Sequence, residues 1–297
     1  MIISASRRTD IPAFYSKWFM SRVEDGNVMV RNPIYPRNIT EIILKPERID
    51  AIVFWTKNPQ NFIQYLPELD DRGFFYYFLF TVTPYGNDFE AKVPPKNQMI
   101  EVFQKLSGIL GKDRVIWRYD PIIFTKKTNE NYHLDQFYNI ASALKNCTFQ
   151  CITSFMVEYK KCIRNMLGMQ IEHPDYLRKK SLLCTLKSIS ESFGMSLKLC
   201  ADEETIEGIE KACCIDPVLI SNRTGKHLKN KKDISQRVQC CCNESIDIGV
   251  YNTCLHQCLY CYANYNTEKV SDTVSAHLSN SPLLVGELNG NENIRIK

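Results

Sequence analysis

Short apolar segments alternate with amphipathic segments along most of the chain. The apolar segments are rich in β-branched and aromatic residues, which is typical of strands. The predicted strands are Ile2–Ser6, Ala51–Thr56, Phe74–Thr83, Arg114–Tyr119, Phe149–Met156, Ser196–Cys200 and Ile246–Tyr251. The predicted helices include Ala13–Glu24, Asn97–Leu110, Leu134–Leu144, Asp175–Phe193 and Glu204–Ala212. Most of the strands are continuous hydrophobic runs, as expected for a parallel sheet that is covered on both faces.

This alternation predicts an α/β fold with a parallel, TIM-like (β/α) arrangement, most simply a partial barrel. No linker divides the first part of the chain, so we expect one barrel-like domain over residues 1–264 and an extension over 265–297. The extension is polar and has no obvious strand, and residues 280–297 are expected to pack loosely. In α/β barrels the functional groups gather at the C-terminal ends of the strands.

The composition favours metal chemistry in a reducing compartment. The 297 residues include 13 cysteines, and no apolar stretch resembles a secretion signal or a membrane span. A cytoplasmic protein with cysteine-rich metal binding therefore explains the cysteines better than a disulfide framework. The net charge of +4 is too small to indicate nucleic-acid binding by itself.

Three cysteines follow the last predicted strand in the pattern C-x3-C-x2-C, at Cys254, Cys258 and Cys261. Such a loop can ligate three irons of a [4Fe–4S] cluster and leave the fourth iron open, whereas a structural cluster normally has four cysteine ligands. The alternatives are zinc shared with Cys240 and Cys242, or redox-active thiols. Within this loop, His256 is expected to face solvent.

The loop resembles the cluster loop of radical S-adenosylmethionine (SAM) enzymes. The resemblance implies that SAM chelates the open iron through its methionyl amine and carboxylate, with Tyr260 near the adenine. One electron, from a small donor such as ferredoxin or flavodoxin, would cleave SAM to methionine and a 5′-deoxyadenosyl radical, which removes a substrate hydrogen. Radical SAM enzymes usually carry this loop near the N-terminus. Its position here predicts a circularly permuted barrel, with Ile2–Ser6 beside the strand that leads into Cys254.

A second set of cysteines precedes this loop. We predict an auxiliary [4Fe–4S] cluster with the ligands Cys200, Cys214, Cys240 and Cys242. The alternative is that several of these residues pack in the core as small hydrophobic side chains. The remaining cysteines in strands and helices are expected to be core residues, namely Cys147, Cys151, Cys162 and Cys184.

Charged residues follow three of the predicted strands. Ser6, Arg7 and Arg8 end the first strand, and arginine forks bind carboxylates and phosphates, so these residues are candidates for binding SAM or an anionic substrate. Ion pairing with other parts of the fold is the alternative. Asp10 and Pro12 fit the first turn of a helix, with Asp10 as its N-cap.

Lys57, Arg118 and Asp120 are the candidate catalytic residues at the ends of two further strands. Arg118 and Asp120 alternate along their strand and therefore share a face. A structural salt bridge between them is as consistent with the sequence as a catalytic pair. Trp55, just before Lys57, is expected in the core or in a pocket wall.

Four segments together resemble an uncharacterised family, domain of unknown function 1848. They are Ser6–Pro12, Val53–Pro59, Trp117–Pro121 and Asp247–Asn264, and the resemblance covers roughly residues 1 to 264. The cluster loop alone also resembles that of spore photoproduct lyase. The family pattern looks like C-G-C where this chain has Cys240-Cys241-Cys242, so Cys241 is a departure from it.

These observations predict a cytoplasmic radical SAM-type iron–sulfur enzyme with an unknown substrate. One alternative is an iron–sulfur or zinc module for electron transfer or structure, without SAM chemistry. Another is a nucleic-acid repair lyase, which requires a basic groove leading to the cluster. The sequence offers only a small basic patch, formed by Lys226, Lys229, Lys231 and Lys232.

Overall fold

The fold is built on one eight-stranded sheet, described here from a computed structural model of residues 1–297. The strand order is β10–β1–β4–β5–β6–β7–β8–β9, and every neighbouring pair is parallel. The strands span Ile2–Ala5 (β1), Ala51–Thr56 (β4), Tyr76–Thr81 (β5), Val115–Ile122 (β6), Gln150–Phe155 (β7), Ser196–Leu199 (β8), Glu210–Lys211 (β9) and Ile246–Asp247 (β10). Because β9 and β10 do not pair with each other, the sheet does not close into a barrel. The predicted α/β class and partial barrel are confirmed.

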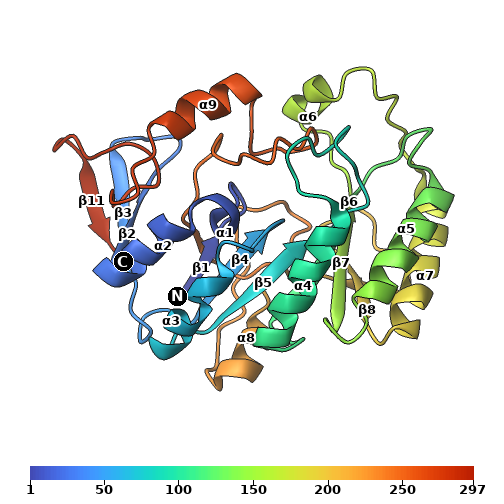
Figure 1. Ribbon diagram of the computed structural model, residues 1–297, viewed down its shortest axis with the longest axis horizontal. Helices are drawn as coiled ribbons and strands as arrows, with labels where there is room; N and C mark the ends of the chain where they lie inside the picture. The colour runs from blue at the N-terminus through green and yellow to red at the C-terminus, as the bar shows by residue number, and fades with distance from the viewer.

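The helices follow the strands along the chain. They are α1 (Ile11–Phe14), α2 (Ser16–Asp25), α3 (Leu66–Asp71), α4 (Lys96–Leu110), α5 (Glu130–Ala143), α6 (Lys160–Asn165), α7 (Tyr176–Ser192), α8 (Pro217–Thr224) and α9 (Thr267–Ser275), with a 3-10 turn at Ile63–Tyr65. Helices α4, α5 and α7 lie along one face of the sheet (Figure 1). None of the helices combines the length and the apolar character that a membrane crossing requires.

Alternate residues of the strands face two different layers, because successive side chains in a strand point to opposite faces. Phe54 and Phe78 belong to the large core under the helices. Val53 and Leu79 belong to a second core on the opposite face of the sheet. This core is covered by the segment 200–242, which includes α8. Both faces of the strands are therefore dry, which is why their sequences read as continuous apolar runs.

A small second sheet packs beside α2 at one end of the molecule (Figure 1). It consists of β2 (Asn27–Arg31), β3 (Asn38–Ile43) and β11 (Asn293–Ile296), in the order β11–β3–β2. Leu283 and Leu284 are buried, and Trp18 Nε1 donates to the carbonyl of Ser281 at 2.9 Å. The expectation of a loose C-terminal tail without a strand is therefore wrong. The polar strand β11 forms because the edge of β3 supplies its hydrogen bonds.

The structure also corrects some of the predicted elements. The segment Glu204–Ala212 is not a helix, because Gly208 turns the chain at φ 78° and the next residues form β9. The predicted strand Ile246–Tyr251 is reduced to the two residues of β10. The helix predicted over Ala13–Glu24 is divided into α1 and α2 at Tyr15. The other predicted strands and helices agree with the structure to within a few residues.

One buried histidine makes stability depend on pH. His133 in α5 is completely buried between the hydroxyl of Tyr119 and the carbonyl of Ile123, at 2.9 and 3.0 Å. Burial lowers the pKa of His133 from 6.5 to about 4. The folded protein thus disfavours a proton that the unfolded chain accepts, so stability is lost as the pH falls from 6.5 toward 4.

We expect the free energy of unfolding to fall by about 3 kcal/mol over that range because of His133. Urea unfolding of the wild type and of His133→Gln at several pH values isolates this contribution. The stability difference between the two proteins should shrink in acid. A difference that stays constant from pH 7 to pH 4 contradicts the assignment.

Candidate functional site

The first strand and the strand before the cysteine loop are neighbours. Ser4 pairs with Asp247 in the parallel register of β1 and β10. The Asp247 carboxylate accepts hydrogen bonds from Ser4 Oγ at 2.9 Å, Ser6 Oγ at 2.6 Å and the Arg7 amide at 2.8 Å. A Cβ at Gly249 would lie 2.0 Å from Ser6 Oγ, so only glycine permits this approach. The predicted placement of Ile2–Ser6 beside the strand that leads into Cys254 is confirmed.

A buried carboxylate fixes the cysteine loop to the sheet. Asp10 caps α1 by accepting from the Ala13 amide at 3.0 Å, as predicted, and it also accepts from the Lys57 amide at 2.7 Å. His256 Nε2 lies 2.8 Å from the same carboxylate, and the ring packs edge-on against Phe14. The expectation that His256 faces solvent is wrong, because only 2% of this residue is exposed. Its partner comes from the other end of the chain, which no local pattern reveals.

A second buried carboxylate, Glu90, supports the loop from the other side. Glu90 pairs with Cys258 in an antiparallel bridge, which places the segment around Glu90 along the loop. Its side chain accepts from Lys57 Nζ at 2.9 Å, from Thr83 Oγ1 and from the hydroxyl of Tyr260. Sequence reasoning missed Glu90, because it lies in a polar loop without a recognisable motif.

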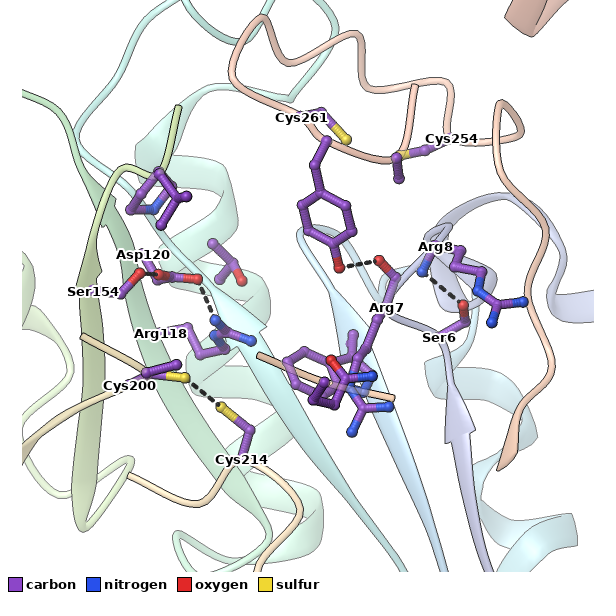
Figure 2. A pocket seen from close by; sticks show the side chains of 18 of the residues that line it. Ser6, Arg7, Arg8, Arg118, Asp120, Ser154, Cys200, Cys214, Cys254 and Cys261 are labelled. Carbon is purple, nitrogen blue, oxygen red and sulfur yellow. Dashed lines mark hydrogen bonds and ion pairs between the residues drawn. The ribbon is translucent and has the colours of Figure 1, made fainter. Parts of the chain in front are cut away.

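All fourteen residues predicted for the site line one cavity of about 650 Å³. They are Ser6, Arg7, Arg8, Lys57, Arg118, Asp120, Tyr260 and the seven cysteines Cys200, Cys214, Cys240, Cys242, Cys254, Cys258 and Cys261. Figure 2 shows Cys254 and Cys261 on the loop at one side of the cavity, and Cys200 and Cys214 at the other. The cavity lies at the C-terminal ends of the strands, where α/β barrels place their chemistry.

The three thiols of the cysteine loop are partly buried, and no hydrogen bond joins them to one another. Burial raises the pKa of Cys258 well above its usual range, against the effect of the Lys57 ammonium. Burial likewise raises the pKa of Cys254. The side chains of the chain do not already form a single-ion site with three or more His, Cys, Asp or Glu groups. Three thiols that are not already gathered as a single-ion site are compatible with a cluster, because each thiolate of a cluster binds a different iron.

The thiols of the second set, in contrast, touch. Cys200 Sγ lies 3.6 Å from Cys214 Sγ, and both residues are buried. Two hydrogen bonds lower the pKa of Cys242. The one from Cys214 has the larger effect, and the one from Cys240 has the next largest. These contacts place the four cysteines of the set in one connected group. Of the other cysteines expected in the core, Cys151 and Cys162 are buried and Cys147 is partly buried. The expectation is wrong for Cys184, which is exposed on α7.

Two guanidinium groups lie between the two cysteine sets. The Arg118 and Arg7 guanidinium carbons are 4.7 and 5.3 Å from the ring centre of Trp55, which lines the cavity as expected. Arg118 forms an ion pair with Asp120, whose other oxygen accepts from Ser154 Oγ (Figure 2). Burial alone would lower the pKa of Arg118, but Asp120 and the thiols of the second cysteine set raise it.

The basic patch does not extend to the cavity. Lys226 pairs with Asp50 at 3.7 Å, and Lys231 pairs with Glu244 at 2.7 Å. None of Lys226, Lys229, Lys231 and Lys232 lines the cavity. These lysines therefore do not form the basic groove that a nucleic-acid repair lyase requires.

Comparison with known proteins adds a family but no activity. No curated protein and no solved structure matches the chain. The family model described as "Domain of unknown function (DUF1848)" matches residues 2–263. The matched region includes the eight-stranded sheet, both carboxylate supports and all seven cysteines of the cavity. The chain therefore belongs to the DUF1848 family.

Proposed function

We propose that this protein is a radical SAM-type iron–sulfur enzyme in which Cys254, Cys258 and Cys261 hold a [4Fe–4S] cluster with one open iron. The observation that carries the proposal is the position of these three thiols. They line a cavity of about 650 Å³ at the C-terminal ends of parallel strands, and no hydrogen bond joins one to another. Three cysteine ligands leave one iron free for a small molecule.

The surroundings of the loop fit such a group. When bound, the cluster with SAM supplies reductive cleavage of SAM, which starts radical chemistry on the substrate. Asp10 and Glu90 hold the loop on its two sides through His256 and Tyr260. The Lys57 ammonium offsets the negative charge of thiolates, since it favours the ionised form of Cys258. The protein thus supplies a fixed loop in a partly enclosed cavity.

Other cavity residues have roles that follow from their charge. Arg8, whose side chain is 24% exposed, is the most accessible cation at the end of β1. We assign it, with Ser6 and Arg7, to the binding of anionic groups such as the SAM carboxylate. Asp120 is held in place by Arg118 and Ser154, and its carboxylate faces the cavity as a group that can orient a substrate.

The proposal includes an electron donor and a compartment. Reductive SAM cleavage needs one electron, which a small carrier such as ferredoxin or flavodoxin would deliver. All 13 cysteines are free thiols. A reducing cytoplasm keeps thiols in that state, so we place the reaction there.

The test is anaerobic purification, with counting of iron, zinc and acid-labile sulfide, followed by incubation with SAM and a strong reductant. We expect iron and sulfide in the protein, and 5′-deoxyadenosine only when the reductant is present. Iron and sulfide without 5′-deoxyadenosine would instead support an electron-transfer module. Zinc without any iron would refute the cluster.

A further inference from the structure

We propose that Cys200, Cys214, Cys240 and Cys242 bind one tetrahedral divalent metal ion, zinc or ferrous iron, and not the second [4Fe–4S] cluster predicted from the sequence. Cys200 and Cys214 of this site lie across the cavity from the cysteine loop (Figure 2). It goes beyond the proposed SAM chemistry and does not depend on it. The argument rests on the spacing of the sulfur atoms, on the burial of the ligands and on the neighbouring charges.

The distance between the sulfur atoms of Cys200 and Cys214 matches one shared ion. A tetrahedral zinc ion with bonds of about 2.3 Å to sulfur separates its sulfur ligands by about 3.8 Å. The sulfur atoms of Cys200 and Cys214 are 3.6 Å apart. In a [4Fe–4S] cluster each thiolate binds a different iron, so the ligands lie farther apart. No hydrogen bond of this kind joins the three thiols of the cysteine loop, as expected if each of them binds a different iron.

The backbone around these thiols is arranged as in a thiolate site. The amide of Ile215 points to Cys242 Sγ and the amide of Cys242 points to Cys240 Sγ, both at 3.4 Å. Amide donors stabilise thiolates over thiols. All four ligands are less than a tenth exposed, so the site excludes water. The contacts join the four thiols two at a time, and no three of them surround one common point. Binding of one ion therefore requires the four side chains to turn toward a common point.

The charges next to the set also suit a buried thiolate centre. Four thiolates around one divalent ion carry two negative charges, which are costly to bury without compensation. Arg7 and Arg118 lie beside the sulfurs with side chains only 9% and 10% exposed, and each also pairs with a carboxylate, Asp233 and Asp120 respectively. Arg7 Nη2 and Arg118 Nε have no hydrogen-bond partner. Buried N–H groups normally donate a hydrogen bond, and the neighbouring thiolate sulfurs can accept from these two.

The test uses a variant that removes the first cluster, Cys254→Ala/Cys258→Ala/Cys261→Ala. It is purified anaerobically, and zinc, iron and acid-labile sulfide are counted. We expect about one ion per chain and no sulfide. Zinc and iron are distinguished by the same measurement, and either supports the site. About four irons with four sulfides per chain, or no bound metal, would overturn it. The proposed function is judged separately, on 5′-deoxyadenosine formation by the wild type.

A matched pair of variants assigns the ligands. Cys214→Ser/Cys242→Ser should lose the ion, whereas Cys213→Ser/Cys241→Ser, which changes the adjacent cysteines outside the cavity, should keep it. If the first variant does not fold, Cys240→Ser alone should release the ion to a chelator at a lower concentration than the wild type does. Equal retention in the ligand variants and the control refutes this ligand set.

Discussion

Cys258→Ala should abolish reductive SAM cleavage and remove the iron held by the cysteine loop. Cys258 is the central ligand of C-x3-C-x2-C, and two remaining thiols cannot hold three irons of a cluster. The substitution leaves the backbone bridge to Glu90 in place, so the loop keeps its support. The measurement is iron and sulfide content, together with 5′-deoxyadenosine formed in the presence of reductant. We expect the product to fall to the level seen without reductant.

Two cysteine controls sharpen this prediction. Cys184→Ala removes an exposed thiol on α7 and should change neither measurement. Cys162 in α6 is more informative, because its Sγ lies 3.0 Å from the carbonyl of Tyr260, beside the loop. Cys162→Ala should retain the cluster if the fourth iron is open. Loss of the cluster in this variant means that Cys162 is a fourth ligand, and the open-iron proposal then fails.

Asp10→Ala should destabilise the whole protein by about 3 kcal/mol or more, since it leaves several buried donors without their acceptor. The Asp10 carboxylate joins the start of α1, the end of β4 and the cysteine loop through Ala13, Lys57 and His256. Asp10 is only 5% exposed, so its hydrogen-bond partners are shielded from bulk water. Urea unfolding at neutral pH measures the loss.

A surface cap provides the matched control for Asp10. Asp175 caps α7 in the same way, accepting from the Arg178 amide at 2.9 Å, but it has no tie to other elements. Asp175→Ala should lower the free energy of unfolding by about 1 kcal/mol, the ordinary value for a helix N-cap. An equal loss of unfolding free energy in the two variants would show that Asp10 acts only as a helix cap. The position of the cysteine loop should also depend on Asp10 and not on Asp175, which iron retention after mild heating can test.

The sequence was most informative where burial leaves a local pattern. The parallel strands are dry on both faces, so β4, β5 and β7 appear as apolar runs, and their positions are confirmed. The cysteines of the cavity follow the same logic, because the ends of parallel strands meet at one edge of a sheet. This is why all fourteen predicted site residues line a single cavity.

The sequence was least informative where a partner lies far away along the chain. By its sequence His256 is a polar loop residue, yet it is buried because Asp10, 246 residues earlier, accepts its hydrogen bond. Glu90 has no motif, and its role follows only from the approach of Lys57 and Tyr260. Strand β11 has no apolar run and exists because β3 offers an open edge.

The sequence alone thus determined the parallel α/β architecture, the cysteines of the loop and the neighbourhood of β1 and β10, because these depend on local hydrophobicity and spacing. The tertiary structure decided how the loop is held and how the second cysteine set is spaced. It placed the sulfur atoms of Cys200 and Cys214 in contact. Such distances depend on the packing of segments far apart in the chain, which no local pattern encodes.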